Sequence, residues 1–340
     1  MKKQFFLIGF LAISMMSFAQ TAANIIVAHA GTSVAYSSLP AAITGAADGA
    51  TVYIPGGIHT LSSDITISKQ LHFKGDGVYT LAVANGLVPQ ISGNKMILKR
   101  AAHGSTFEGV YFTNVLELKH ETTDLTGNFH ITINRCKFDN NIIASGGNSV
   151  IGNVIIMVNQ SIVSGFSLST AIEALYVNNS IILGSSIYNV DQGLIKNSIS
   201  LDANYLQLSS TSNLLIANSI IFGYVSLGTN NTVSNCLIRT GRTISTEIAS
   251  TNNLWQDWAD IFVNAPNNSY NQGYDYHLKS GCLGIGAGND GLDVGIYGGT
   301  NPWKELLVPA SPNVYHKSVS SSNDSEGKIN ATYKVKAQTN

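Results

Sequence analysis

A short repeated pattern constrains the fold of this chain more than any other feature. Six segments between residues 131 and 238 each contain an apolar strand, a polar bend that ends in Ser or Cys, and a second apolar strand. These Ser and Cys anchors are 17 to 25 residues apart, with a mean spacing of 20, and they are Cys136, Ser161, Ser180, Ser198, Ser219 and Cys236. Three residues before each anchor is a β-branched residue: Ile133, Val158, Val177, Ile195, Ile216 and Val233. A strand-forming repeat of this length predicts a solenoid, in which each unit buries its apolar face on its neighbours.

The position just before each anchor is polar in every repeat. It is occupied by Arg135, Gln160, Asn179, Asn197, Asn218 and Asn235. Asn tolerates the left-handed backbone that a tight bend between strands requires. We expect these amides to stack from coil to coil and to hydrogen-bond to one another along the axis. A row of amides that contacts a glycan is the alternative interpretation.

The first residues are typical of a secretory signal peptide. Lys2 and Lys3 precede an apolar run from Phe5 to Phe18, and small residues flank Phe18 at the expected cleavage point after Ala19. The run is shorter than the ~20 residues that span a bilayer. We therefore expect residues 1–19 to be removed and the mature protein to be secreted or held in the outer cell envelope, with no membrane insertion after signal removal.

The composition restricts the kind of partner. Charged residues make up 11% of the chain and apolar residues 44%, so the outer surface must consist largely of Asn, Ser, Thr and Gly. The formal net charge of −1 leaves no basic patch of the kind that binds nucleic acid. We expect a polysaccharide or cell-surface component as partner, and no nucleic acid. The oligomeric state does not follow from the sequence.

The cysteines are predicted to be packed thiols. Cys136 and Cys236 are five repeats apart, which corresponds to roughly 24 Å at the ~4.8 Å spacing of stacked strands. A disulfide needs Cα atoms within about 7 Å. These two thiols are therefore expected to replace Ser as small buried groups, and Cys282 is expected to be buried as well.

Both ends of the predicted solenoid, residues 20–299, differ from its middle. Ser37 or Ser38 can start a short capping helix that runs to Ala47, with an apolar side formed by Leu39, Ala42, Ile43, Ala46 and Ala47. Residues 252–298 are predicted to form the closing coils, with Trp255 and Trp258 covering the far end. Residues 300–340 are predicted to be a tail, with one edge strand at 328–336.

Two stretches resemble a known family. GAADGATVYIPGGIHT (45–60) and LHFKGDG (71–77) resemble the opening of pectate-lyase-like right-handed parallel β-helix proteins, and DYHLKSGCLGIGAG (275–288) with DVGIY (293–297) resembles their closing segment. The family often has Ser-Pro where this chain has Gly281-Cys282 or Cys282-Leu283. The resemblance spans about residues 24–299 and implies an all-β, right-handed parallel β-helix. It implies no single activity, because the family contains lyases, hydrolases, adhesins and members without known activity.

Glu173 and Asp191 form the best acidic pair. Each lies seven residues before an anchor, so we expect them to stand about 5 Å apart on adjacent coils. Two such carboxylates could bind calcium or act as acid and nucleophile. A solvated surface pair is the alternative.

A cationic set precedes them in the chain, and a looser His/Asp set follows. Arg or Lys could neutralise a uronate while His removes a proton, and the residues that could form such a groove are Arg100, His103, Lys119, His120, His130, Arg135 and Lys137. Lys137 also interrupts an apolar column that contains Ile162, Ile181, Ile199, Ile220 and Leu237. Asp275, His277, Asp290 and Asp293 have the composition of a metal site without its spacing.

Few charges occur in the middle repeats, and this favours a non-catalytic role. We expect an exported β-helix that contacts glycans or envelope components through its Asn/Ser/Thr face, without a cofactor. The alternative is a polysaccharide lyase or glycoside hydrolase, for which the catalytic candidates are Lys119, His120, Arg135, Glu173 and Asp191. Calcium is expected only for a lyase.

Overall fold

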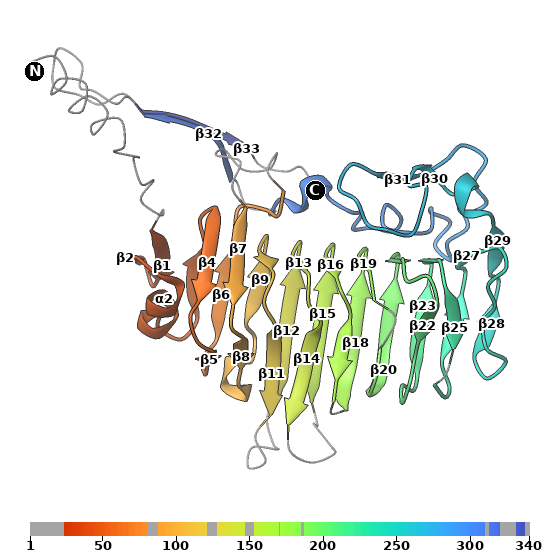
Figure 1. Cartoon of the computed structure of the whole chain (residues 1–340), viewed down its shortest axis with the longest axis horizontal. Helices are drawn as coiled ribbons and strands as arrows, with labels where there is room; N and C mark the ends of the chain where they lie inside the picture. Colours follow the sequence, from red (N-terminus) through yellow and green to blue (C-terminus); the bar gives the residue numbers. More distant parts are fainter. Residues whose placement is uncertain are drawn as a thin grey trace, which may run out of the picture.

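The chain winds into a β-solenoid of about 9 turns whose coils stack in parallel (Figure 1). This computed structural model describes residues 24–79, 88–120, 128–146, 153–169, 171–184, 187–226, 228–309, 313–319 and 331–336. The expected signal peptide, residues 1–19, lies outside the described residues. The prediction of an all-β parallel β-helix with one short N-terminal helix is confirmed.

Three sheets form the walls of the solenoid. Sheet A has 12 strands in the order β2 (Thr32–Tyr36), β1 (Ile25–His29), β3 (Ala50–Tyr53), β6 (Leu71–Lys74), β9 (Thr106–Glu108), β12 (Phe129–Asn134), β15 (Val154–Asn159), β18 (Ile172–Asn178), β20 (Val190–Lys196), β23 (Leu214–Ala217), β26 (Thr232–Ser234) and β28 (Ala249–Thr251). Sheet B has 10 strands: β4 (Gly57–Leu61), β7 (Pro89–Gly93), β10 (Tyr111–Phe112), β13 (Lys137–Phe138), β16 (Ile162–Val163), β19 (Ile181–Ile182), β21 (Ile199–Ser200), β24 (Ile220–Ile221), β27 (Leu237–Arg239) and β29 (Leu254–Gln256). Sheet C has 5 strands: β5 (Ile65–Ile67), β8 (Met96–Leu98), β11 (Leu116–His120), β14 (Ile142–Gly146) and β17 (Phe166–Leu168). Later coils replace sheet C by the pair β22 (Tyr205–Gln207) and β25 (Tyr224–Ser226).

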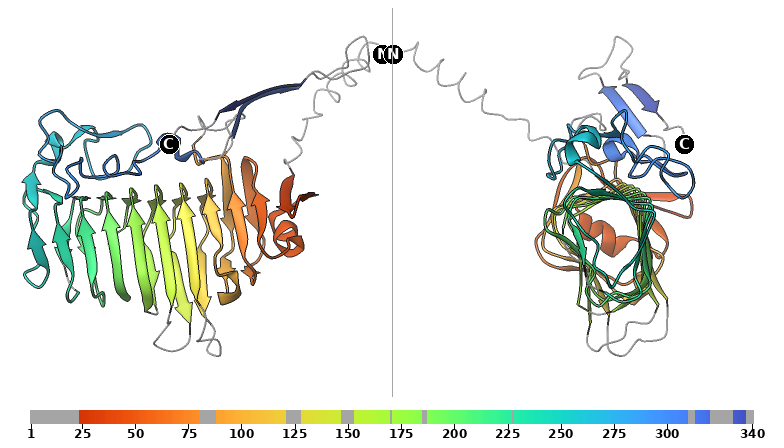
Figure 2. Two further views of the ribbon diagram at one scale, coloured as in Figure 1. Left: turned by 180° about the vertical axis from the view of Figure 1, so that it is seen from behind. Right: turned by 90° about the vertical axis from the view of Figure 1, so that its right-hand side faces the viewer.

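The interior consists of apolar columns that run along the axis. The β-branched residues three before each anchor pair in register from Ile133 to Val233, and each is at most 2% exposed. Side chains alternate across a strand, so one face of each sheet A strand fills this column while the other faces outward. The end-on view of Figure 2 shows the coils superimposed around this core. The predicted layering is confirmed.

A short helix covers the N-terminal end, as predicted, but it stops early. α2 (Leu39–Gly45) starts at Ser38, whose hydroxyl accepts a hydrogen bond from the Ala41 amide, and it buries Leu39, Ala42 and Ile43. Ala46 has an extended backbone and ends the helix. The prediction that Ala47 belongs to the buried side is therefore wrong, since Ala47 lies beyond the helix and is exposed.

The prediction that residues 252–298 form the closing coils is wrong for the residues after Gln256. The last coil strands are β28 and β29, and the chain then folds back along the outside of sheet B through η3 (Trp258–Asp260), β30 (Phe262–Asn264), β31 (Asp275–Leu278) and η4 (Glu305–Leu307) (Figures 1 and 2). We call residues 258–307 the return segment. Trp258 is buried against Phe222 and Phe262. Trp255 remains 44% exposed and does not cover the end.

The return segment encloses a second apolar core. The outward residues of sheet B pair in register and are fully buried, and they are Ile162, Ile181, Ile199, Ile220 and Leu237. They pack with Val294, Ile296 and Trp303 of the return segment. At Gly295 an added Cβ would stand 2.7 Å from the Ile220 side chain, so the backbone lies directly on the sheet. Lys137 interrupts the column as predicted, with its ammonium 4.1 Å from the Tyr111 ring centre.

Beyond the return segment, β32 (Asn313–Val319) and β33 (Ala331–Lys336) form an antiparallel hairpin. The predicted edge strand at 328–336 thus has a partner. No helix in the described part of the chain is long and apolar enough to cross a bilayer.

Candidate functional site

Each of the six repeats turns from sheet A to sheet B through a single residue in the left-handed region. The φ angles lie between 46° and 53° at all six positions: Arg135, Gln160, Asn179, Asn197, Asn218 and Asn235. The predicted left-handed bend is confirmed in every repeat. It points these side chains outward at the corner between the two sheets.

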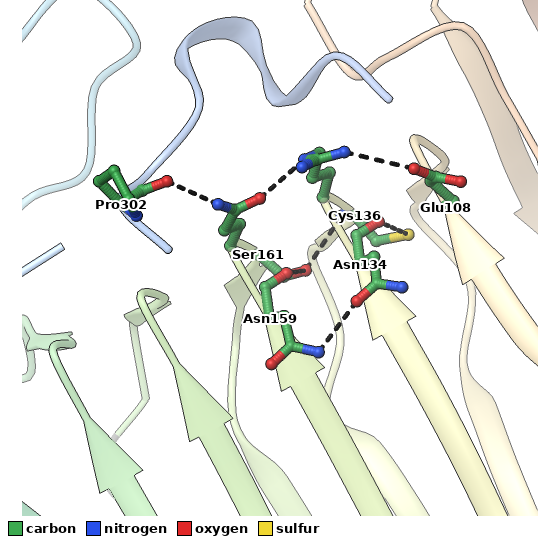
Figure 3. A network of polar contacts seen from close by, with 8 residues as sticks. Glu108, Asn134, Cys136, Asn159, Ser161 and Pro302 are labelled. Carbon is green, nitrogen blue, oxygen red and sulfur yellow. Dashed lines mark hydrogen bonds and ion pairs between the residues drawn. The ribbon is translucent and has the colours of Figure 1, made fainter. Parts of the chain in front are cut away.

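The anchors that follow form a hydroxyl ladder inside this corner. The Ser161 Oγ accepts a hydrogen bond from the Cys136 amide at 3.1 Å and donates to the Asn159 carbonyl at 2.8 Å (Figure 3). Ser180, Ser198 and Ser219 repeat both contacts one coil further on. Cys136 and Cys236 occupy the ends of the column, where each thiol contacts the carbonyl two residues earlier. Burial raises the pKa of both thiols to about 12, so they remain protonated and unreactive.

An amide ladder exists, but not in the predicted column. It lies two residues before the anchors, where Asn159 Nδ2 donates to Asn134 Oδ1 at 2.9 Å (Figure 3). One coil further on, Asn178 Nδ2 donates to Asn159 Oδ1 at 3.1 Å. The bend amides instead hold the return segment, whose backbone carbonyls need donors. Asn179 donates to the carbonyls of Ile296 and Gly298 at 2.9 and 2.8 Å.

Between this ladder and the return segment lies a polar groove of about 480 Å³. Its lining combines the three ladder amides with side chains from neighbouring coils and from the return segment: Glu108, Asn134, Arg135, Asn159, Gln160, Asn178, Asn179, Lys196, Asn197, Asp290, Thr300 and Asn301. The volume is within the range of small-ligand sites. Among the residues that the structure describes, no aromatic side chain contributes to the lining.

Ion pairs close the groove at both ends of the ladder. Arg135 Nη1 lies 3.3 Å from Glu108 Oε1, and its Nε donates to Gln160 Oε1 at 2.7 Å. Burial lowers the pKa of Arg135 and Glu108 opposes this shift. Lys196 Nζ lies 3.4 Å from Asp290 Oδ2 at the other end. The four charges of the lining therefore cancel.

Asn197 differs from the other bend amides. Its side chain is 3% exposed and lines the groove, yet its Nδ2 has no hydrogen-bond partner among the described residues. The backbone of Gly298 and Gly299 lies against this amide, since a Cβ added at Gly298 would stand 2.7 Å from Nδ2. The groove thus contains a buried donor that the protein leaves unused.

The predicted cationic set is distributed over several walls. Lys119 and His120 lie on β11 in sheet C, where Lys119 pairs in register with Ser145, whereas Arg135 lies at the corner of sheets A and B. The His120 side chain is outside the described residues. Lys137 is on sheet B and pairs with Asp139 at 2.8 Å.

The remaining members lie near the start of sheet A. Arg100 is buried in η2 (Arg100–Ala102), and the His103 Nδ1 accepts a hydrogen bond from the His130 amide at 3.0 Å. Burial and the neighbouring His103 lower the pKa of His130. Of the six predicted cationic residues whose side chains are described, only Arg135 lines the groove.

Glu173 and Asp191 are neighbours, as predicted. Register pairs on both sides, Ile172 with Val190 and Ala174 with Gln192, place the two carboxylates beside each other on β18 and β20. Glu173 is partly buried and Asp191 is exposed.

The His/Asp set does not converge. His277 Nδ1 lies 2.7 Å from Asp275 Oδ1, and its ring stacks on Tyr297. Asp293 instead accepts the Gly286 amide, and Asp290 pairs with Lys196. Within the described ranges, no three His, Cys, Asp or Glu side chains are grouped to hold a metal ion.

Sequence reasoning missed the groove as a unit. Asp290, Thr300 and Asn301 reach it from residues far along the chain, and only the return of that segment over sheet B brings them there. No protein-family model matches the chain, and no curated protein matches it either.

Proposed function

We propose that this chain is an exported protein of the pectate-lyase-like β-helix class that binds glycans in the polar groove and does not cleave them. The groove supports this proposal because amides supply both donors and acceptors, which sugar hydroxyls require. The ladder presents one such amide on each of three successive coils.

The separation of the groove carboxylates supports binding without hydrolysis. Glu108 and Lys196, the partner of Asp290, are four coil steps apart in the register of sheet A. At ~4.8 Å per coil this is about 19 Å. The carboxyl pairs of glycoside hydrolases are about 5–9.5 Å apart. Glu108 and Asp290 are therefore too distant to act on one bond.

A glycan-binding experiment tests the proposal. The purified protein is incubated with a panel of neutral and uronate-containing polysaccharides, and both retention and new reducing or unsaturated ends are measured. We expect retention without product, and weaker retention for Asn159→Ala, which interrupts the ladder. Thr232→Ala, on the outer face of sheet A and outside the groove, is the control. Release of product that is lost in Lys119→Ala, His120→Ala or Arg135→Ala would overturn the non-catalytic proposal.

A hydrolase is the second candidate, and the adjacency of Glu173 and Asp191 favours it. Their spacing of one coil is close to the ~5–5.5 Å of retaining enzymes. Product formation that disappears in both Glu173→Gln and Asp191→Asn would support this candidate. Product formation unaffected by both changes would eliminate it.

A further inference from the structure

We infer that the groove binds an uncharged polysaccharide chain that lies parallel to the solenoid axis, with Asn197 donating to a sugar hydroxyl. The inference rests on the proposed glycan binding and specifies the class of glycan. It draws on the unused hydrogen-bonding capacity of the ladder, the charge balance of the lining and the unpartnered Asn197 amide.

The ladder leaves a matched donor and acceptor on its central amide. Asn159 donates one N–H to Asn134 and accepts one from Asn178. A side-chain amide has two N–H donors and an oxygen with two lone pairs, so in the described part of the chain Asn159 retains one of each. A hydroxyl group can satisfy both, because it donates and accepts. A carboxylate or phosphate only accepts and would leave the second lone pair of the amide oxygen without a donor.

The charges of the groove are already neutralised. Arg135 and Glu108 are 12% and 16% exposed and pair with each other, and Lys196 pairs with Asp290. An anionic ligand would have to displace Glu108 or Asp290 or lie beside them. Like charges in a partly buried site repel, so a uronate is disfavoured and a neutral sugar is not.

The Asn197 side chain supplies a further donor, and its lack of a partner in the described structure indicates a ligand. Its Nδ2 is buried at the groove without a partner among the described residues. A buried N–H without an acceptor is costly, and a bound hydroxyl oxygen relieves that cost. The backbone of Gly298 and Gly299 packs against the amide and holds it in place, since a Cβ at either position would lie within 3 Å of it.

The repeat sets the direction of the ligand. Asn134, Asn159, Asn178 and Lys196 occupy one outward column on consecutive coils. This column is about 14 Å long at ~4.8 Å per coil. A chain that follows the axis meets one polar side chain per coil, whereas a chain across the coils meets the ladder only once.

Titration calorimetry on the full chain tests the inference. The probes are neutral oligosaccharides of increasing length (xylo-, manno- and gluco-oligosaccharides) and oligogalacturonates. We expect binding of a neutral series that strengthens with length and does not change between low and high salt, because no charge is neutralised. Asn197→Ala should weaken it about 3- to 10-fold, the loss of one hydrogen bond.

Asn235→Ala is the matched control variant. Asn235 has the same left-handed backbone, but its amide donates to the Ala287 carbonyl and it does not line the groove. We expect this variant to lower the melting temperature more than Asn197→Ala, which removes an Nδ2 donor without a partner among the described residues, and to bind normally. Both variants incur the same backbone cost, so this contrast separates a ligand contact from a structural role.

The outcomes separate the inference from the proposed function. Salt-sensitive binding of oligogalacturonates, or an Asn197→Ala protein that binds neutral sugars as tightly as the unaltered chain, overturns the inference and leaves glycan binding intact. Absence of binding to every glycan overturns both.

Discussion

Sheets A and B are built from the same stacked parallel strands, but their outer faces differ in burial. The outer face of sheet B is buried, whereas the outer face of sheet A is exposed. On β19 both Ile181 and Ile182 are at most 1% exposed, so this strand is buried on its two faces. On β15 buried residues alternate with side chains such as Met157, which is 38% exposed. The difference arises because the return segment covers sheet B and leaves sheet A open. Adjacent apolar residues in a strand thus indicate a second covering layer, and alternation indicates an open face.

The largest loss of stability is expected for a substitution in the interior column, which lies behind the outer faces of both sheets. Ile195→Asp places an unpaired carboxylate in the shared interior column, where Ile195 is 2% exposed. We expect a loss of more than about 4 kcal/mol in the free energy of unfolding, and no folded protein at 37 °C. Circular dichroism and urea unfolding measure this. A cooperative transition within about 1 kcal/mol of the unaltered chain would contradict the inside–outside assignment.

Ile199→Asp affects the covered face only. Its side chain packs under the return segment, so we expect a loss of about 3 kcal/mol, confined to the release of that cover. The strand signal in circular dichroism should persist while limited proteolysis cuts within residues 258–307. Thr232→Asp, on the outer face of sheet A, is the control and should leave proteolysis unchanged. Equal sensitivity of the two variants would remove the distinction between the faces.

Ser180→Ala tests the corner that joins the two faces. It leaves the Ser161 amide without its acceptor, and we expect a loss of about 1–3 kcal/mol. Ser180→Cys should cost less, because Cys occupies the same column at positions 136 and 236. Urea midpoints of the two variants give the comparison. If Cys is as harmful as Ala, the ladder is not what stabilises the bend.

Glu173→Ala should have the smallest effect. The side chain faces outward on sheet A and has no described ion pair, so we expect the free energy of unfolding to change by less than about 0.5 kcal/mol. Thermal unfolding of the variant beside the unaltered chain measures this. A loss near that of Ile199→Asp would mean that sheet A carries an unrecognised cover.

The fold was largely predictable because each coil repeats one pattern. The Ser and Cys anchors fixed the register, and the Asn residues before them indicated the left-handed bends. The return segment was not predicted, although the paired apolar residues at 181–182 and 220–221 were its signal. The predicted capping role of Ala47 and the predicted closing role of Trp255 were wrong, because both side chains are exposed.

The groove was less predictable than the fold. Arg135 was predicted to share a groove with Lys119 and His120, which lie on sheet C. It lies instead at the corner of sheets A and B, where it pairs with Glu108. Sequence spacing gives the column of a residue within the coils, but Asp290 and Asn301 approach from a segment that has no repeat. Only packing against sheet B determines where they meet the ladder.

The course of the return segment also decides where the polypeptide leaves the rod. Pro309 lies over Gly109, so close that a Cβ there would stand 2.6 Å from its ring. Gly109 follows β9, in the N-terminal half of the coils, so a cargo or tether fused after residue 309 emerges at the same half of the rod as residue 24. The opposite tip, formed by β28 and β29, lies at the far end of the rod from this point (Figure 1).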